Sequence, residues 1–300
     1  MLGAVKYFKR FIKTIKVKIR NKLKAIVGID TIQEEIDSVY YILDKGIDIS
    51  RFPKAEGALR EYQLAETELL RIFHDVCQKL NLTYWLDWGT LLGAVRHNGF
   101  IPWDDDLDVA MPREDFNKAK TVLVDEFSQL GFNTVIKNAI YIWNEKVGVA
   151  LDIFAVDKVQ YDGDIEKLRK KAKDFYSECI KIYEPSGWRY MEGVDELRDK
   201  IITAENGEMI YYSAVETCGR LYAFKPEDIF PLKKHTFEQY EFFVPNNEII
   251  YVGTQYNDYL SYPRQGILHH VKSGVPIYLK AAENNYSLSE FTAKLSKINY

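Results

Sequence analysis

Cysteine is scarce in this sequence, and its arrangement excludes two kinds of structural site. The chain has three cysteines, which lie far apart and form no Cys-x-x-Cys pair: Cys77, Cys179 and Cys218. An odd number of widely spaced cysteines indicates neither a disulfide framework nor a zinc knuckle. We therefore expect a protein of a reducing compartment, the cytoplasm.

Long apolar runs are absent as well. No uncharged apolar run approaches the ~18–20 residues that a membrane-spanning helix needs, and the start lacks an apolar core with a small-residue cleavage site. No internal repeat or low-complexity linker is present. The 300 residues are 47% hydrophobic, which supplies a core for one large domain or two small ones. We expect a globular protein that is neither transmembrane nor secreted by that route.

Acidic residues are missing from residues 1–28, which hold nine of the 40 Lys and Arg. The rest of the chain sets 31 Lys and Arg against all 44 Asp and Glu, so the two parts suit different partners. Within residues 1–28 the cations fall largely opposite an apolar stripe with three- and four-residue spacing: Phe8, Phe11, Ile12, Ile15, Ile19, Leu23 and Ile26. This pattern predicts a basic amphipathic helix.

Two interpretations of the basic helix remain open. It can lie on an anionic membrane, where each nearby cation adds about 1 kcal/mol, or it can dock as an ordinary terminal helix on the acidic body. Nucleic acid is disfavoured as a partner because the acidic remainder repels phosphate. We expect a cytoplasmic protein held peripherally at the inner face of the cell membrane by residues 1–28. A helical arm and loop at 29–54 then lead into a main domain at 55–300.

A strand, a glycine and a short helix follow one another at residues 83–97. The segment TYWLDW (83–88) has the aromatic and β-branched content of a strand, and Gly89 ends it. Thr90 is placed to cap a helix over 90–97, whose first turn exposes backbone N–H groups and the positive end of the helix dipole. A helix N-terminus after a strand and a glycine is a cradle for phosphate.

Four aspartates crowd into the next segment, GFIPWDDDLDVAM (99–111). DLDVAM (106–111) predicts a strand, and alternation along it places Asp104, Asp106 and Asp108 on one face. Carboxylates that share a face repel each other unless a cation lies among them. They suit one Mg²⁺, or two ions about 3.5–4 Å apart, which makes phosphoryl transfer the natural chemistry.

Two other interpretations of the acidic run are weaker. A calcium-binding EF-hand loop would carry Val109 where the sharp turn requires Gly, and Asp115 where a bidentate Glu is required. A solvated acidic loop would leave unexplained the flanking Trp103 and the immediate entry into an apolar strand. A divalent-cation site is the favoured interpretation.

A lone acid, Asp152, lies in a third predicted strand, VGVALDIFAVD (147–157). One interpretation is a charge at the edge of the strand, paired with a Lys or Arg. The other is a third carboxylate that a neighbouring strand delivers to the cation site. The residues alone leave both open.

The segment YWLDWGTLLGAVRHNGFIPWDDDLDVAMPRED (84–115) resembles the signature of the LicD family, relatives of the fukutin-related proteins. The resemblance extends to LREYQLAETELLRIFHDVC (59–77), to LDIF (151–154) and to two distal segments, 229–247 and 254–270. It therefore covers most of the main domain. Its central block is long enough to be highly specific.

The resemblance implies an α+β, nucleotidyltransferase-like fold, a mixed β-sheet flanked by helices with a helical, aromatic-rich C-terminal part. Residues 81–160 would form the core and residues 161–300 the acceptor side. The implied cofactor is Mg²⁺, with Mn²⁺ as a substitute, and the implied metal ligands and catalytic residues are Asp106, Asp108 and Asp152. In this scheme the ion neutralises the diphosphate, while Asp152 aligns or deprotonates the attacking hydroxyl.

Further residues are candidates for contact with the substrate. They are Gly89, Thr90, Arg96, His97, Trp103, Asp104, Lys146, Arg264, His269 and His270. Several have a plainer interpretation, since Arg96 and His97 also suit a helix C-terminus and Trp103 also suits packing. The abundant tyrosines after position 175 suit either an acceptor groove or a core.

The implied activity is transfer of a phospho-alcohol, typically phosphocholine, from a CDP-activated donor to a sugar hydroxyl, with release of CMP. The acceptor would be a lipid-linked precursor of a capsule, a teichoic acid or a lipopolysaccharide. Glycerol, ribitol and ethanolamine phosphates are alternative cargoes. Two rival hypotheses are an NTP-using nucleotidyltransferase that releases pyrophosphate and a non-catalytic glycan- or membrane-binding protein. The intact set of glycine, threonine and three acids disfavours the non-catalytic hypothesis.

Overall fold

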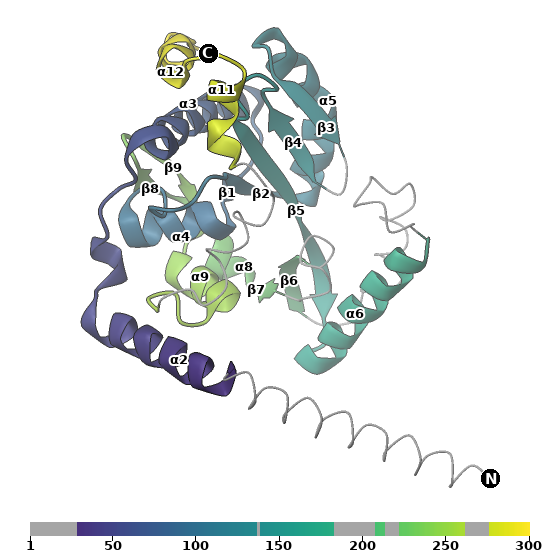
Figure 1. Cartoon of the computed structure of the whole chain (residues 1–300). Helices are drawn as coiled ribbons and strands as arrows, with labels where there is room; N and C mark the ends of the chain where they lie inside the picture. The colour runs from purple at the N-terminus through teal and green to yellow at the C-terminus, as the bar shows by residue number, and fades with distance from the viewer. Residues whose placement is uncertain (1–28, 137–138, 183–207, 214–221, 262–275) are drawn as a thin grey trace, which may run out of the picture. The chain divides into compact units, whose positions relative to one another are not determined.

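The computed structural model describes residues 29–136, 139–182, 208–213, 222–261 and 276–300. The chain divides into two compact units, Met1–Ile49 with Leu260–Arg264, and Ser50–Tyr259 with Gln265–Tyr300. The predicted basic helix of residues 1–28 lies outside the described residues. In the smaller unit the structure describes the 18-residue helix α2 (Ile29–Gly46), dark purple in Figure 1.

The larger unit is built on a seven-stranded mixed sheet (Figure 1). Its main path runs β1-β2-β5-β4-β3, and β6 and β7 continue from β5. Among the described strands β2 and β5 pair in parallel, whereas the other neighbours are antiparallel. The bounds are β1 (Trp85–Leu86), β2 (Asp108–Pro112), β3 (Asn133–Ile136), β4 (Ile140–Trp143), β5 (Ala150–Tyr161), β6 (Glu208–Ser213) and β7 (Tyr222–Phe224). The predicted α+β fold, a mixed sheet flanked by helices, is confirmed.

The long strand β5 shows why this sequence forms the centre of the sheet (Figure 1). Leu151, Ile153 and Ala155 are fully buried, whereas Asp152 and Phe154, which alternate with them, retain some exposure. Successive side chains of a strand point to opposite faces, so one face of β5 is entirely core. Asp152 therefore lies on the face that is not filled by these aliphatic residues.

Two long helices cover the sheet. The 24-residue α3 (Gly57–Leu80) buries an apolar stripe of three- and four-residue spacing through Leu69, Ile72, Phe73 and Val76, and packs on β5 and on the C-terminal helix α12 (Leu288–Leu295). It ends where Asn81 takes a left-handed conformation and donates its N–H to the last turn, a usual C-terminal cap. The second helix, α5 (Arg113–Gln129), packs on β2, β3 and β5.

The remaining described elements are a second sheet and further helical segments. A second, two-stranded sheet is the hairpin of β8 (Lys233–Phe237) and β9 (Tyr240–Val244). The other helical segments are η1 (Ile49–Arg51), α4 (Trp88–His97), α6 (Ile165–Ile182), α8 (Pro226–Ile229), α9 (Glu248–Tyr256), η2 (Ile277–Leu279) and α11 (Lys280–Glu283).

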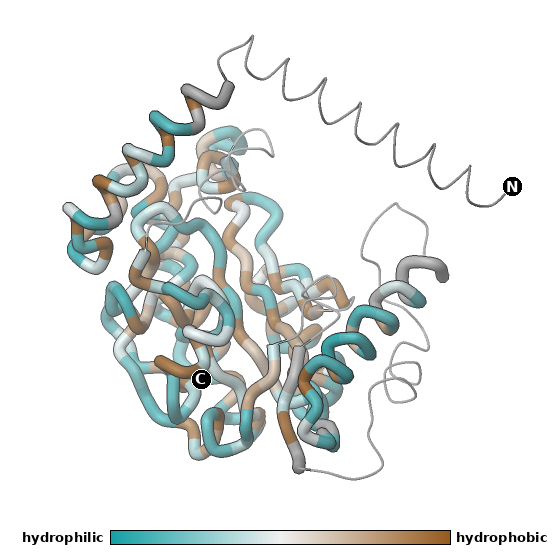
Figure 2. The backbone as a smooth tube through the Cα atoms, turned by 90° about the horizontal axis from the view of Figure 1, so that it is seen from below, coloured by the Kyte–Doolittle hydropathy of each residue, from teal (hydrophilic) through white to brown (hydrophobic). Residues whose placement is uncertain are grey.

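The exposed helices are amphipathic rather than apolar. In α6 the apolar Leu168, Ala172 and Phe175 are buried, while much of the rest of the helix is hydrophilic and teal in Figure 2. Within the part of the chain that the structure describes, no helix is both long and apolar enough to cross a membrane.

A close backbone contact fixes where the acidic segment leaves α4. A Cβ atom at Gly93, inside α4, would lie 2.4 Å from the carbonyl oxygen of Gly99 and 3.1 Å from the nitrogen of Ile101. The helix ends at Asn98, which is left-handed with φ 51°. The chain therefore turns back tightly over its own helix before it enters the aspartate cluster.

We predict that Gly93→Ala destabilises the protein by about 1–3 kcal/mol, because the new methyl group meets backbone that has no room to move. Gly253→Ala is the matched control, since Gly253 lies inside α9 with no atom within 4 Å of an added Cβ. That control should be neutral or stabilising by up to about 1 kcal/mol, the difference in helix propensity. Urea denaturation of both variants tests this, and equal effects of the two substitutions would contradict the packing argument.

Candidate active site

The parallel pairing of β2 and β5 brings two aspartates together. In this register Asp108 is the direct partner of Asp152, and the Asp152 N–H donates to the carbonyl of Leu107 at 2.8 Å. Directly paired residues of neighbouring strands project from the same face of a sheet. The interpretation of Asp152 as a carboxylate delivered from a neighbouring strand is therefore the one that the geometry favours.

The other aspartates reach the same place from a loop. The predicted strand over 106–111 was wrong at its start, because β2 begins at Asp108 and Asp104 to Leu107 have no regular structure. Strand alternation therefore does not hold them on one face. Asp104 and Asp106 lie instead against Gly89 at the start of α4. A Cβ atom added at Gly89 would lie 2.7 Å from Oδ2 of Asp104 and 3.9 Å from Oδ1 of Asp106.

The start of α4 differs from the prediction. The helix begins at Trp88, which has φ 42°, and Asp87 occupies the N-cap position, so the prediction that Thr90 caps the helix was wrong. Thr90 lies within the first turn, and its Oγ1 accepts a hydrogen bond from the Asp108 N–H at 2.8 Å. The Asp87 N–H in turn donates to the Asp108 carbonyl at 3.0 Å. These two bonds fasten the first turn of α4 to the first residue of β2.

The carboxylates repel one another strongly. Burial, followed by the charges of Asp106 and other neighbouring aspartates, raises the pKa of Asp104 and of Asp108 well above the usual value. Burial and the charge of Asp106 raise the pKa of Asp152 to about 7. Each shift means that the charged form is disfavoured as the side chains stand. The site is a concentration of negative charge that a bound cation would stabilise.

Two further acids face this cluster, and neither was among the predicted site residues. Glu66 of α3 is completely buried, and its electrostatic neighbours are Asp106, Asp105 and Asp104. Asp87 is buried, accepts a hydrogen bond from Gln255 Nε2 at 2.8 Å, and has its pKa raised by burial to about 6. A sequence signal for Glu66 exists, because it occupies the position of an apolar residue in the stripe that contains Leu69 and Phe73.

Aromatic side chains from the C-terminal part close one side of the site. Tyr222 and Tyr256 pack edge-on against Trp88, with ring centroids 5.1 Å and 6.4 Å away. Burial and then the charges of Asp108, Asp104, Asp87 and Asp106 raise the pKa of Tyr256 well above its usual value, which places this tyrosine beside the acids.

Arg96 and His97 end α4, and the structure gives them different environments. Arg96 is buried, donates to the carbonyl of Tyr259 at 2.7 Å and interacts with the charge of Asp104. Its pKa falls to about 10 through burial, so it stays cationic at neutral pH. Burial and the charge of Arg96 lower the pKa of His97 to about 4, so His97 is neutral there. Arg96 is thus a predicted substrate contact that the structure brings to the cluster as a cation.

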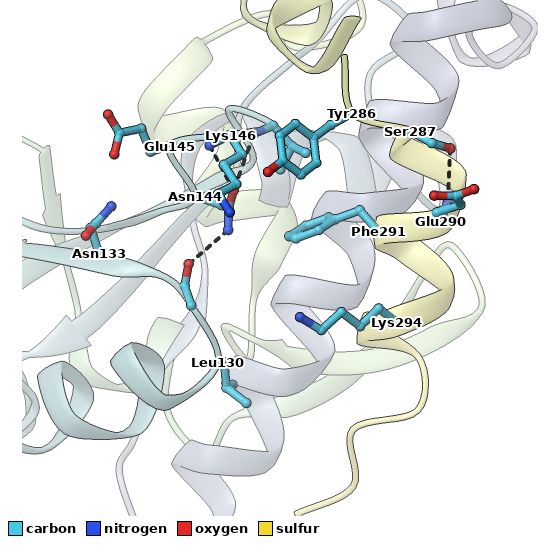
Figure 3. A pocket seen from close by; sticks show the side chains of 12 residues that line it. Leu130, Asn133, Asn144, Glu145, Lys146, Tyr286, Ser287, Glu290, Phe291 and Lys294 are labelled. Atoms are coloured by element: carbon cyan, nitrogen blue, oxygen red, sulfur yellow. Dashed lines mark hydrogen bonds between the residues drawn. The ribbon is translucent and has the colours of Figure 1, made fainter. Parts of the chain in front are cut away.

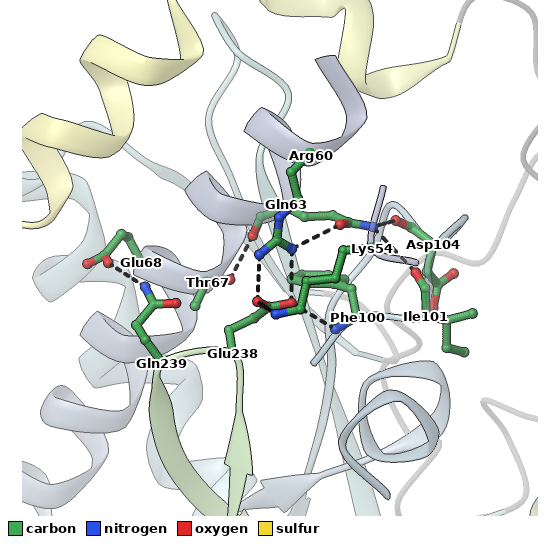
Figure 4. A network of polar contacts seen from close by, with 10 residues as sticks. All are labelled: Lys54, Arg60, Gln63, Thr67, Glu68, Phe100, Ile101, Asp104, Glu238 and Gln239. Carbon is green, nitrogen blue, oxygen red and sulfur yellow. Dashed lines mark hydrogen bonds and ion pairs between the residues drawn. The ribbon is translucent and has the colours of Figure 1, made fainter. Parts of the chain in front are cut away.

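A polar clamp holds the loop that carries the aspartates (Figure 4). Gln63 of α3 donates to the carbonyl of Asp104 at 2.9 Å, and its own amide oxygen accepts from Arg60 at 3.3 Å. Arg60 forms a bidentate pair with Glu238 at 2.9 and 2.6 Å, and Glu238 also accepts the Phe100 N–H at 3.2 Å. Glu238 sits at the tip of the β8–β9 hairpin with φ 56°. Helix, hairpin and acidic loop are thereby locked together.

Two predicted substrate contacts lie in other surroundings. Trp103 packs edge-on against Phe52 at 5.8 Å between centroids, which favours its packing role. Lys146 lies over the ring of Tyr286 at 5.3 Å and lines a pocket of about 470 Å³ between the β4–β5 turn and α12 (Figure 3). Arg264, His269 and His270 lie outside the described residues.

The carboxylates do not form a ready coordination shell. Within the described ranges, no group of three or more His, Cys, Asp or Glu side chains is arranged to hold a metal ion. The donor set nevertheless suits Mg²⁺ chemically, because it consists of carboxylate oxygens. The residues fit a hard divalent cation by charge and ligand type, and binding would require their side chains to converge.

Comparison with known proteins identifies the family. The family described as "LicD/FKTN/FKRP, nucleotidyltransferase domain" matches residues 81–247, which include the whole aspartate cluster and Asp152. The chain belongs to the LicD family. This LicD-family match begins after α3, so Glu66 and Gln63 lie outside it.

Individual relatives align with this LicD-family chain over stretches of 68 to 195 residues. The lipopolysaccharide cholinephosphotransferase LicD of Haemophilus influenzae is 47% identical over 68 residues, 23% of this chain and 26% of that protein. Mouse and human ribitol 5-phosphate transferase FKRP are 31% identical over 80 residues, 27% of this chain and 15% of theirs. An uncharacterized protein of Rickettsia prowazekii is 30% identical over 195 residues, 65% of this chain and 55% of that one. The chain thus spans little more than half of the length of even that relative.

We predict that the metal-free LicD-family protein loses stability as the pH rises from 6.5 to 8. A carboxyl group whose pKa is raised by folding contributes stability at low pH and loses it as the pH passes its folded pKa, about 7 for Asp152. Each proton that folding takes up costs about 1.4 kcal/mol per pH unit. His97 has the opposite sign, but its effect ends near pH 6.5, its unfolded pKa.

Urea denaturation in EDTA at several pH values measures this slope. Asp152→Asn should make the slope shallower, because one of the titrating groups is removed. A free energy of unfolding that is constant or rises over this range would contradict the repulsion within the acidic site.

Proposed function

We propose that this LicD-family chain transfers a phospho-alcohol, phosphocholine first, from a CDP-activated donor to a sugar hydroxyl of a cell-surface glycan precursor, and releases CMP. The observation that carries the proposal is the aspartate cluster at the first turn of α4, where Gly89 leaves room beside Asp104 and Asp106. This arrangement offers carboxylates for a cation next to a helix N-terminus that favours phosphate.

Asp106, Asp108 and Asp152 would hold Mg²⁺, or Mn²⁺ in its place. When bound, the ion supplies positive charge for the diphosphate of the donor. The chain itself contributes the α4 dipole and Arg96, a buried cation near Asp104, to bind donor phosphate. Asp152, paired with Asp108 across the two parallel strands, is suited by its position to orient the sugar hydroxyl and accept its proton.

Phosphocholine is preferred among the possible cargoes for a physical reason. The rings of Trp88, Tyr222 and Tyr256 gather at the start of α4, and aromatic rings attract a quaternary ammonium through cation–π interaction. The relative named as a cholinephosphotransferase supports the same choice. Ribitol phosphate is the second cargo, because the other named relatives are ribitol 5-phosphate transferases.

A nucleotidyltransferase that uses an NTP and releases pyrophosphate is the second candidate function. The description of the matched family as a nucleotidyltransferase domain favours it. The two functions use the same carboxylates and differ in the leaving group. CMP from a CDP-alcohol supports the first function, and pyrophosphate from an NTP supports the second.

The proposal includes a location for the acceptor. Residues 1–28 carry nine cations and no acid, a composition suited to an anionic membrane surface. A peripheral position at the inner face of the cell membrane would bring the site to a lipid-linked acceptor. Sedimentation with anionic vesicles measures this step separately from catalysis.

The test incubates purified protein and Mg²⁺ with CDP-choline, CDP-ribitol, CDP-glycerol and CDP-ethanolamine, and scores CMP by mass spectrometry. We predict that Asp106→Asn and Asp152→Asn each lower CMP release at least about 100-fold, because each removes a charge beside the transferred phosphate. Asp125→Asn, the same change at an exposed position of α5, is the matched control and should keep wild-type activity.

Two results would overturn the proposed function. One is full CMP release by Asp106→Asn and Asp152→Asn. The other is pyrophosphate from an NTP with no CMP from any of the four CDP-alcohols, which would support the nucleotidyltransferase.

A further inference from the structure

Two glutamates of α3, two positions apart, are both buried but differ in their partners. Glu68 accepts hydrogen bonds from Arg71 at 2.9 Å, from Tyr240 at 2.7 Å and from Gln239 at 3.3 Å. Glu66 is completely buried, neither of its carboxylate oxygens has a partner of full hydrogen-bond geometry among the described residues, and the Tyr62 hydroxyl is the polar group beside it. Glu68 is therefore explained by the fold, whereas Glu66 is not.

The position of Glu66 directs it toward the aspartates. Residues three and four apart share a helix face, so Glu66 lies on the face of Tyr62 and Gln63. Gln63 contacts the acidic loop through the carbonyl of Asp104 at 2.9 Å. The Tyr62 hydroxyl lies beside Glu66 and acts to lower its pKa against the larger effect of burial, but it donates its hydrogen bond at 2.9 Å to the carbonyl of Gly148. The charges nearest to Glu66 are those of Asp106, Asp105 and Asp104.

An acid at this buried position does not stabilise the folded protein. Burial and then the charges of Asp106 and Asp105 raise the pKa of Glu66 well above its usual value, so in the cation-free protein the charged form is disfavoured. Glu66 also occupies a place in the apolar stripe of α3, where an apolar side chain would contribute to the core. Packing gives no reason for an acid at this position, whereas a ligand that the acids share would give one.

We propose that Glu66 contributes its carboxylate to the cation bound by the aspartate cluster, which extends the site from the sheet onto α3. This inference rests on the cation of the proposed function. It concerns a residue outside the family match at 81–247. The described side chains form no ready coordination shell, so the bound ion would have to draw Glu66 and the loop aspartates together.

The experiment measures binding of Mn²⁺ to the full chain by electron paramagnetic resonance, which counts free Mn²⁺ and needs no substrate. Glu66→Gln should raise the Kd at least about 10-fold, because it removes a negative charge from the site. Its melting temperature in EDTA should be close to that of the wild type, because Gln has nearly the same shape as the neutral acid that Glu66 is in the metal-free protein. Glu68→Gln is the matched control; it should bind Mn²⁺ within about twofold of the wild type but melt lower, because its partners are disturbed.

The possible outcomes separate this inference from the proposed function. If the wild type binds Mn²⁺, Asp106→Asn does not, and Glu66→Gln binds like the wild type, the inference is wrong while the proposed cation site stands. If Glu66→Gln melts lower or does not fold, Glu66 has a structural role and the inference is overturned. If the wild type binds no Mn²⁺, both the inference and the proposed cation are wrong.

Discussion

Repulsion between Asp108 and Asp152 is the interaction on which the rest of the site depends. The parallel pairing of β2 and β5 makes them direct partners, so the sheet itself forces two carboxylates together. Neighbouring elements hold these two carboxylates in place. The hydroxyl of Thr90 and the N–H of Asp87 fasten α4 to Asp108, and the start of α4 brings its positive dipole to the cluster. The β8–β9 hairpin then clamps the loop that adds Asp104 and Asp106.

Much of this arrangement follows from the sequence, because local patterns determine it. Apolar spacing of three and four predicts α3, and the alternation around Asp152 predicts β5. The LicD-like segment predicts the family and the mixed sheet. Residue order alone does not decide the role of Asp152, since an edge charge and a site carboxylate look alike until the register with Asp108 is known.

The parts that the sequence does not predict depend on single dihedral angles or on distant residues. The left-handed φ of Trp88 starts α4 two residues before Thr90, which turns the expected cap into a bond to β2. The pair of Arg60 and Glu238 joins residues 178 positions apart, so no local pattern predicts it. Glu66 was detectable as an acid in an apolar stripe, but its direction toward the aspartates required the packing of α3.

The central claim is that this repelling cluster is a cation site. Anomalous diffraction from crystals of the full chain grown with Mn²⁺ tests it most directly, because the signal locates the ion without assuming any activity. The account predicts a peak at ligand distance from Asp106, Asp108 and Asp152. A Mn²⁺ peak elsewhere, with none among these carboxylates, would contradict it.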